Sequence, residues 1–220
     1  MRTYVSPIGY DTRRVTRPVV NTGLGSGDTV QLLRPQVESD TERATQAVAD
    51  VEQLLQEIEP TAECTTSRVT TDSFEGTVRD CCTILGQIPD DSQTIVSLGG
   101  GARDVLLPLT IAAIVFARKI DQALFFSDLD NTVREWSLPA LTAQVPNRTY
   151  ESFTTITSAE DWISLSTIAE QTDQSKSTVI RHVNDLEEIG VIESDTREKT
   201  KLVRASFSGE LFELGQQLTV

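Results

Sequence analysis

The sequence is poor in the residues that build metal sites and covalent crosslinks. It contains one histidine and three cysteines among 220 residues. The cysteines Cys64, Cys81 and Cys82 are odd in number, two are adjacent, and none belongs to a CxxC pair. A disulfide framework needs an even, spaced set, and a structural zinc site needs clustered cysteines and histidines. We therefore expect free thiols and no bound metal.

Long apolar runs are also absent. The longest stretch dominated by apolar residues, Val105 to Ala117, has 13 residues and includes Pro108, whereas a membrane-spanning helix needs about 20. The N-terminus shows no apolar run ending in a cleavage site, so it does not resemble a signal peptide. The sequence predicts a soluble, cytoplasmic protein with no membrane partner.

Positive charge is scarce as well. The chain has 33 acidic and 19 basic side chains, a formal net charge of −14 and a pI near 4.5. This balance opposes nonspecific attraction to nucleic acid or to an anionic membrane. Only four basic residues are lysines, methionine occurs once and threonine is abundant. That combination indicates a halophilic host, in which acidity reflects the solvent and leaves a nucleic-acid partner open.

Short apolar strands alternate with amphipathic helices over the first two thirds of the chain. In 41–58 and again in 74–88, apolar residues recur at spacings of 4, 3, 4 and 3, the period of one helix face. The pattern predicts strands at 3–8, 29–33, 65–71, 94–98 and 123–127, an edge strand at 133–138, and helices at 13–20, 41–58, 74–88 and 102–119. We therefore predict an α/β fold with a Rossmann-like, mainly parallel sheet.

Two loops of this sheet are candidate ligand sites, because parallel sheets bind ligands at the carboxyl ends of their strands. They are Ser6 to Arg14 and Gly99 to Asp104. In the second loop, three glycines let backbone amides approach a phosphate, the next helix N-terminus adds partial positive charge, and Arg103 adds a cation. A tight turn that needs the glycines for its own geometry is the alternative interpretation.

Motifs for catalysis are missing. The sequence has no GxSxG elbow, no GxxxxGK[ST] loop and no metal-spaced carboxylates. The segment from Asp128 to Asn131 carries two aspartates, but its position between two strands favours a hairpin turn. His182, the only histidine, is distant in sequence from both candidate loops. We expect no catalytic residues, no cofactor and no enzyme activity.

The last third of the chain has a different pattern. Pro139 and Pro146 interrupt a stretch without strong periodicity, which predicts two domains at 1–141 and 150–220. A short helix at 166–172 is followed by a turn, a second helix that Ser175 can cap, and strands at 191–193 and 202–207. This order is typical of a winged helix-turn-helix.

Basic residues of this last domain are concentrated in one region. Residues 150–220 contain 6 basic and 13 acidic groups, and all six basic ones lie between 176 and 204. We predict that the second helix presents Lys176, Ser177, Thr178, Arg181 and His182 to the major groove of promoter DNA, and that the wing presents Arg197, Lys199 and Lys201 to phosphates. A winged helix used only for protein contacts or dimerisation is the alternative.

Two strings carry a specific resemblance. The segment Ser97-Leu98-Gly99-Gly100-Gly101-Ala102-Arg103-Asp104 is similar to the glycine-glycine-x-arginine motif after strand four of CARF domains. Residues 175–192 resemble the recognition helix and wing entry of winged-helix regulators. Together they resemble the archaeal CRISPR-associated transcriptional regulators that join a CARF domain to a C-terminal winged helix. Ala102 departs from that family, whose motif often has a hydroxyl residue there.

The resemblance implies a homodimer whose paired loops form one pocket for a cyclic oligoadenylate. It assigns Ser6, Pro7, Ile8, Gly9, Tyr10 and Arg13 to one wall, and Gly99, Gly100, Gly101, Ala102 and Arg103 to the other. The apolar helix at 105–117 would lie in the core and partly in the dimer seam. The function implied is a ligand-responsive DNA-binding regulator of CRISPR-related genes.

Two alternatives remain open from the sequence. One is a small cyclic-nucleotide phosphodiesterase with the winged helix as a docking module, because some CARF domains cleave their ligand slowly. The other is a metabolite-sensing regulator unrelated to CRISPR.

Overall fold

The computed structural model describes residues 1–38, 40–127, 129–197 and 200–217. The chain divides into two compact units, Met1–Leu138 and Pro139–Val220. Ala143 and Val145 pack against the core of the second unit, and the backbone N–H of Ala140 donates to the Oγ of Ser208 at 3.0 Å. The segment between the two predicted domains is therefore part of the second unit.

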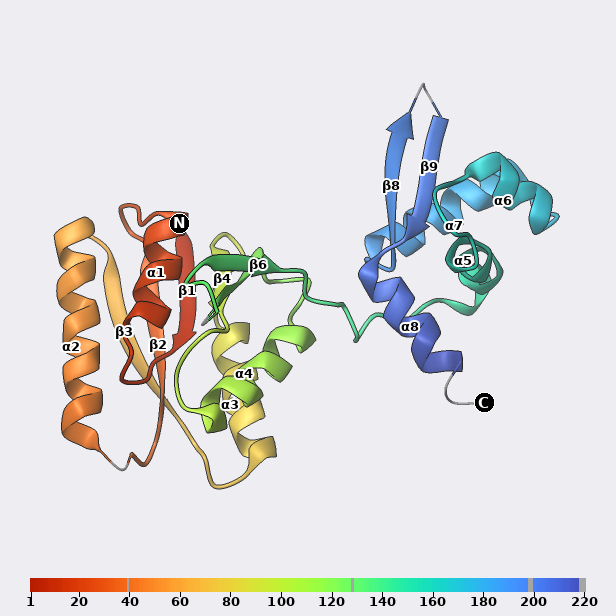
Figure 1. The fold of residues 1–220 in the computed structure, drawn as a ribbon. Helices are drawn as coiled ribbons and strands as arrows, with labels where there is room; N and C mark the ends of the chain where they lie inside the picture. The colour runs from red at the N-terminus through yellow and green to blue at the C-terminus, as the bar shows by residue number, and fades with distance from the viewer. Residues whose placement is uncertain (39, 128, 198–199, 218–220) are drawn as a thin grey trace. The chain divides into compact units, whose positions relative to one another are not determined.

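The first unit alternates strands and helices, as Figure 1 shows. Its elements are β1 (Arg2–Pro7), α1 (Arg13–Thr22), β2 (Thr29–Pro35), α2 (Thr41–Ile58), β3 (Glu63–Val69), α3 (Phe74–Gly86), β4 (Gln93–Ser97), α4 (Arg103–Val115), β5 (Gln122–Phe126) and β6 (Val133–Trp136). The sheet order is β3-β2-β1-β4-β5-β6, in which β1 to β5 run parallel and β6 pairs antiparallel with β5. The predicted Rossmann-like, mainly parallel sheet is confirmed.

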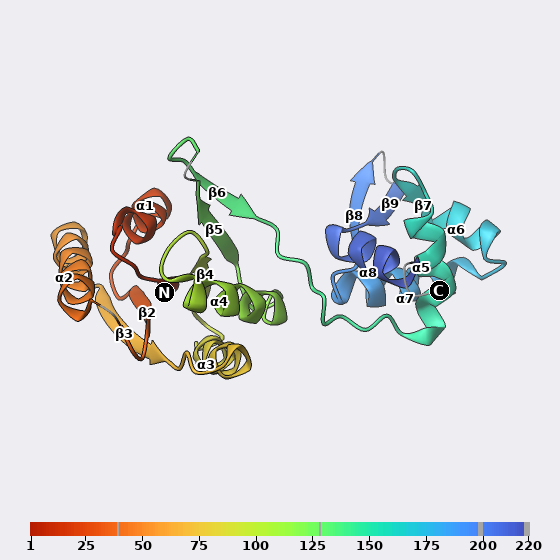
Figure 2. The ribbon, with the colours of Figure 1, turned by 60° about the horizontal axis from the view of Figure 1, so that its bottom comes forward.

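Both faces of the sheet are covered by helices. Successive side chains of a strand point to opposite faces, so Tyr4 of β1 joins a core with α1 and α2, and Val5 joins a core with α3 and α4. Figure 2 shows the two helix pairs on opposite sides of the sheet. Burial on both faces explains why β2 and β4 carry consecutive apolar residues.

The strand order reverses between β1 and β4. From β1 the chain crosses through α1 to β2 on one side, and from β3 it returns through α3 to β4 on the other side. The loops that follow β1 and β4 therefore diverge to opposite faces at one edge of the sheet. A doubly wound sheet has its ligand crevice at such a switch point.

The three glycines after β4 are packed against different neighbours. A Cβ on Gly99 would lie 2.7 Å from the backbone nitrogen of Phe126, and one on Gly100 would lie 2.8 Å from the Cβ of Arg14. Gly101 has a φ of +80°, where a side chain is strained. Since contacts this short require the neighbours to shift, the loop needs glycine for its own packing.

Helix α4 differs from its expected extent. It ends at Val115 rather than at Lys119, because a turn in which the Lys119 N–H bonds the carbonyl of Phe116 leads the chain to β5. One face is buried in the core, but Leu107, Ile111 and Val115 form an apolar stripe that is 42–56% exposed. Among the residues that the structure describes, no helix is long and apolar enough to cross a bilayer.

The second unit contains the predicted winged helix, which is confirmed. Its elements are η1 (Asn147–Thr149), α5 (Tyr150–Thr157), β7 (Ile163–Ser164), α6 (Leu165–Gln171), α7 (Lys176–Glu188), β8 (Ile192–Arg197), β9 (Thr200–Ala205) and α8 (Phe207–Gln217). The three strands form an antiparallel sheet in the order β7-β9-β8. As expected, Ser175 caps α7 through a hydrogen bond from the Thr178 N–H to its Oγ, at 3.2 Å.

Two helices of this unit are missing from the sequence-based prediction. The helix α5 precedes β7, and α8 begins at Phe207, where a strand was predicted to end. Ser206 stops the strand because its hydroxyl accepts the N–H of Gly209 and so starts the helix. Phe153 of α5 and Phe212 of α8 pack edge to face, 5.6 Å between ring centroids, so both helices belong to the core.

The glycine packing gives a first prediction. Replacing Gly99 with alanine should lower the free energy of unfolding of the first unit by about 1–3 kcal/mol, the usual cost of overpacking. Gly86→Ala is the matched control, because a Cβ there would meet only side-chain atoms of Phe116 at 3.6 Å or more. Denaturant unfolding in molar KCl measures both. Equal midpoints for the two variants would contradict the packing explanation.

Candidate ligand cleft and nucleic-acid interface

Two adjoining cavities lie at the carboxyl edge of the sheet, over the switch point. Their volumes are about 520 Å³ and about 470 Å³. Both are lined by Gly9, Tyr10 and Gly101, which come from the loops after β1 and β4. We call the two cavities together the cleft.

The larger cavity is suited to an anion. Arg103, on its wall, is exposed and makes no ion pair within the described residues. Ala102 precedes α4 and gives its N-terminus no side-chain cap. The N–H of Val105 donates to the carbonyl of Ala102, which leaves the N–H groups of Arg103 and Asp104 and the helix dipole available to a negative group. Arg14, also on the wall, is held by the carbonyl of Gly99, 2.8 Å from its Nη1.

The wall of the smaller cavity is partly apolar and partly acidic. Ile8, Pro35, Val37 and Ala44 supply its apolar surface, and Glu38 and Asp104 its carboxyl groups. The side chain of Glu38 is only 9% exposed and pairs with Arg34 and with Arg68. Burial opposes ionisation of this carboxyl, but the hydrogen bonds from Arg34 and Arg68 prevail and lower its pKa.

Tyr10 stands at the junction of the two cavities with its ring covered on one side. The guanidinium of Arg43, from the first turn of α2, lies 4.4 Å from the ring centroid, a cation–π distance. The residue is 44% exposed. An aromatic ring in this place offers a flat surface to a planar group.

Most of the predicted ligand residues line the cleft, and three do not. Ile8, Gly9, Tyr10, Gly99, Gly100, Gly101, Ala102 and Arg103 are on its walls. Ser6 is buried and its hydroxyl contacts the carbonyl of Pro7, whereas Arg13 points its guanidinium at Asp11. Pro7 packs against Gly101. Ser6 and Pro7 thus pack behind the loop, and Arg13 is exposed beside Asp11, a residue of the cavity wall.

Several wall residues were not foreseen. Pro35, Glu38 and Thr71 come from the ends of β2 and β3 and from the loops that follow them. Arg14 ends the first candidate loop but was not assigned to the ligand, and it comes from the first turn of α1. Because a parallel sheet brings the carboxyl ends of its strands to one edge, the position of Pro35, Glu38 and Thr71 at or just after a strand could have predicted that they line the cleft. Arg14 needed knowledge of the direction in which α1 leaves the sheet.

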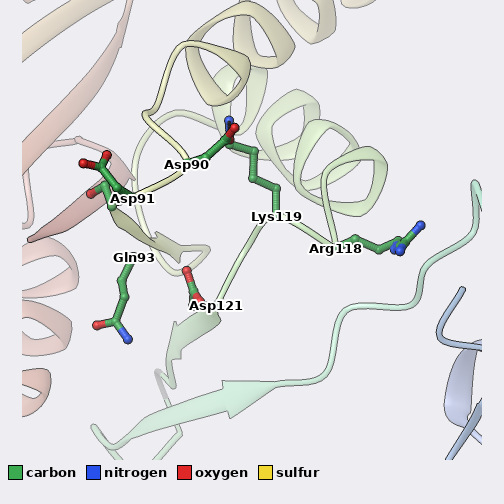
Figure 3. A pocket seen from close by; sticks show the side chains of 7 residues that line it. Asp90, Asp91, Gln93, Arg118, Lys119 and Asp121 are labelled. Carbon is green, nitrogen blue, oxygen red and sulfur yellow. Dashed lines mark ion pairs between the residues drawn. The ribbon is translucent and has the colours of Figure 1, made fainter. Parts of the chain in front are cut away.

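A third cavity, of about 540 Å³, lies at the opposite edge of the sheet. Figure 3 shows its aspartates and the pair between Lys119 and Asp90, 3.0 Å apart. Asp121 accepts the backbone N–H of Thr94 at 2.7 Å. Its polar groups thus serve the turns before β4 and β5, and it lies away from the switch point.

Metal and thiol chemistry find little support in the described residues. They contain no group of three or more histidine, cysteine, aspartate or glutamate side chains placed to hold a metal ion. Cys64, Cys81 and Cys82 are free, and burial raises the pKa of Cys64 to about 11 and that of Cys81 to about 12. Such thiols are poor nucleophiles. Asp128, of the predicted hairpin turn, lies outside the described residues.

Helix α7 exposes a polar face at its N-terminal half. Val179, Val183 and Leu186 are buried in the domain core, while Lys176, Ser177 and Arg181 are exposed. Thr178 is half-buried and its hydroxyl contacts Ser175. Among the described residues neither Lys176 nor Arg181 makes an ion pair. These residues are placed as the helix pattern predicted.

His182 does not face outward, which corrects the prediction. The residue is 4% exposed, and its Nδ1 lies 3.0 Å from the Oγ of Ser152 in α5. Its spacing of three residues from Val179 and four from Leu186 places it on the buried face of α7, a signal that the sequence-based prediction did not use. Burial, together with the nearby charge of Arg181, lowers the pKa of the imidazole.

Two of the three predicted wing cations, Arg197 and Lys201, are paired with carboxylates. The Nε of Arg197 lies 2.9 Å from Asp195, and the Nζ of Lys201 lies 2.8 Å from Glu187. Lys199 lies outside the described residues. The structure therefore places the predicted phosphate contacts beside negative groups.

The single histidine gives a second prediction. In an NMR pH titration the ring signals of His182 should report a pKa below the ordinary value of about 6.5. The unfolded chain then takes up the proton first as the pH falls, so the second unit should lose stability below about pH 6.5. A titration midpoint at or above 6.5 would instead place the ring in solvent, as the sequence pattern suggested.

Comparisons with known proteins agree with this architecture. Residues 2–133 match the model of the Csa3 CRISPR-associated Rossmann-like domain, and residues 159–193 match a winged helix-turn-helix DNA-binding domain. No curated protein matches the chain.

Among solved structures, Csm6 from Enterococcus italicus bound to cyclic hexa-2'-fluoro-hexa-dAMP aligns with 87% of this chain, with a TM-score of 0.52 and 10% identity. Protein VC1899 from Vibrio cholerae aligns with 96% of this chain and 63% of its own, with a TM-score of 0.47 and 8% identity. The chain spans 55% of the Csm6 chain, so this similarity concerns the fold. With its Rossmann-like unit matched almost throughout, the chain belongs to the family of the Csa3 CRISPR-associated Rossmann-like domain.

Proposed function

We propose that the protein is a homodimeric, DNA-binding transcriptional regulator that senses a cyclic oligoadenylate in the cleft and controls CRISPR-related genes. The observation that carries the proposal is the uncapped N-terminus of α4 beside the unpaired Arg103, both at the switch point of the sheet. The match of residues 159–193 to a DNA-binding winged helix supports the second half.

The chemistry of the cleft fits a ligand of linked nucleotides. One cavity offers a cation and helix amides to phosphodiester groups, which carry one negative charge each. The adjoining cavity offers apolar surface and the ring of Tyr10 to a base. The Csm6 structure of similar fold, bound to a cyclic oligonucleotide, supports this ligand class.

A dimer would join two clefts. The apolar stripe of α4, Leu107, Ile111 and Val115, is exposed in the single chain and suits burial against a second copy. Ligand that contacts both protomers would favour one relative placement of the winged helices over another. Such differential binding is the requirement for a ligand to alter DNA affinity.

We further propose that the cleft binds its ligand without rapid cleavage. A hydrolase of this kind needs a base near the reacting hydroxyl. Glu38 is held by two arginines with a lowered pKa, which makes it a weak base. Metabolite sensing unrelated to CRISPR has no specific observation in its favour.

Arg103→Gln should separate ligand sensing from DNA binding. Loss of a charge-assisted hydrogen bond costs about 1.5–3 kcal/mol, or about 10- to 150-fold in affinity for cyclic tetra-adenylate. DNA affinity should lose its response to the ligand but persist without it. Calorimetry and fluorescence anisotropy in molar KCl measure the two effects.

Arg118→Gln is the matched control, because Arg118 lines the cavity at the opposite edge. It should leave both affinities unchanged. If Arg103→Gln behaved like this control, the sensing role of the cleft would be wrong. Chromatography of the ligand after long incubation should recover it intact, and turnover would point to the phosphodiesterase instead.

A further inference from the structure

The described cations of the hairpin β8–β9 are Arg197, Lys201 and Arg204, and each is paired with a carboxylate. Glu193 lies opposite Arg204 in the strand register, and their side chains form an ion pair. Asp195 and Glu187 hold Arg197 and Lys201. The hydrogen bonds from these cations lower the pKa of Asp195 and of Glu187, so both carboxyl groups stay charged at neutral pH.

An aromatic contact restrains the arginines further. The guanidinium groups of Arg197 and Arg204 lie 5.3 Å and 4.6 Å from the ring centroid of Trp162. Side chains of a strand alternate between faces, and Lys201 is paired instead with Glu187 of α7. The described wing cations are thus divided between two faces and do not together form one positive surface.

A phosphate contact made by one of these paired cations would add little to the affinity for DNA. A cation that moved to a phosphate would leave its carboxylate beside the polyanion, where like charges repel. A cation that its carboxylate already neutralises also neutralises no phosphate, so it releases none of the counterions condensed on the DNA, and that release drives the electrostatic part of DNA binding.

The N-terminal half of α7 has the opposite character. Lys176, Ser177, Ile180, Arg181 and Asn184 are exposed, and residues three or four apart share one helix face. We call these five residues the contact face. Its cations are unpaired among the described residues, and at its centre Ile180 is 41% exposed. An apolar group there can contact the methyl group of thymine.

On the basis of the proposed DNA-binding function, we infer that the contact face holds the DNA, with Ile180 reading a base, and that the wing cations Arg197, Lys201 and Arg204 make no phosphate contact. Among the described cations of the second unit, only Lys176 and Arg181 then displace counterions from the DNA, so binding depends weakly on salt. Such recognition suits the salt-rich host that the composition indicates.

The test compares single-charge variants on a duplex of about 30 base pairs, selected from a random pool by the wild-type full chain. Affinity is measured by fluorescence anisotropy between about 0.3 and about 1.2 M KCl. Arg181→Gln should flatten the slope of log affinity against log salt by about 0.9, or about 3.5-fold over this range. Lys201→Gln and Arg197→Gln should change the slope much less, because salt at these concentrations screens the carboxylate that each substitution leaves unpaired.

Two further variants test the roles of the pairs and of Ile180. Glu187→Gln keeps an acceptor for Ser194 but frees Lys201, so it should tighten binding at low salt and steepen the slope by about 0.9. Ile180→Ala should weaken binding to the selected duplex at least about fivefold with an unchanged slope.

The outcomes separate this inference from the proposed function. A slope flattened equally by Lys201→Gln and Arg181→Gln would overturn the inference and leave DNA binding intact. An Ile180→Ala variant that binds like wild type would remove the base-reading role. If the wild-type chain selects no duplex, the DNA-binding function itself fails, and the inference with it. Thermal midpoints near that of wild type show that each variant is folded.

Discussion

Close backbone packing between the loops after β1 and β4 is the contact on which the cleft depends. A Cβ on Gly9 would lie 3.2 Å from the Cα of Gly101, so the two loops meet at the width of their backbones. Gly99 and Gly100 pack equally closely on β5 and α1. This packing fixes the N-terminus of α4 at the switch point and aims its amides at the cleft. The glycines therefore satisfy packing first, and binding capacity follows from where the packing leaves α4.

Sequence periodicity predicted the order of every element in the first unit, because helix and strand periods are local properties. It also placed Arg103 and Gly101 on the cleft, because the loop after a parallel strand lies at the carboxyl edge of the sheet, where ligands bind. It did not find Glu38 or Thr71, whose side chains reach the cleft only through the order of the strands. Ser6 belongs to β1 and its side chain is buried. The prediction treated it as a loop residue and therefore as part of the ligand site.

In the second unit the sequence-based prediction was wrong about His182 and did not foresee the partners of the wing cations. The prediction turned His182 to the polar side of α7, yet its spacing from Val179 and Leu186 places it on the buried face, where α5 covers it and Ser152 contacts its ring. The wing cations were correctly placed on the hairpin, but their carboxylate partners come from the cross-strand register and from α7. An acidic chain thus neutralises much of its own positive charge and leaves the exposed helix face as the feature that distinguishes this domain.

The central claim is that the cleft binds a cyclic oligoadenylate. Thermal unfolding of the full chain in molar KCl, with cyclic tetra-adenylate at about one hundred times its dissociation constant, tests it most directly. Linkage predicts about 2.7 kcal/mol of stabilisation, which raises the midpoint of the Rossmann-like unit by about 5–10 °C. Linear oligoadenylates at the same concentration should give a much smaller rise. Equal midpoints with and without the cyclic ligand would contradict the account.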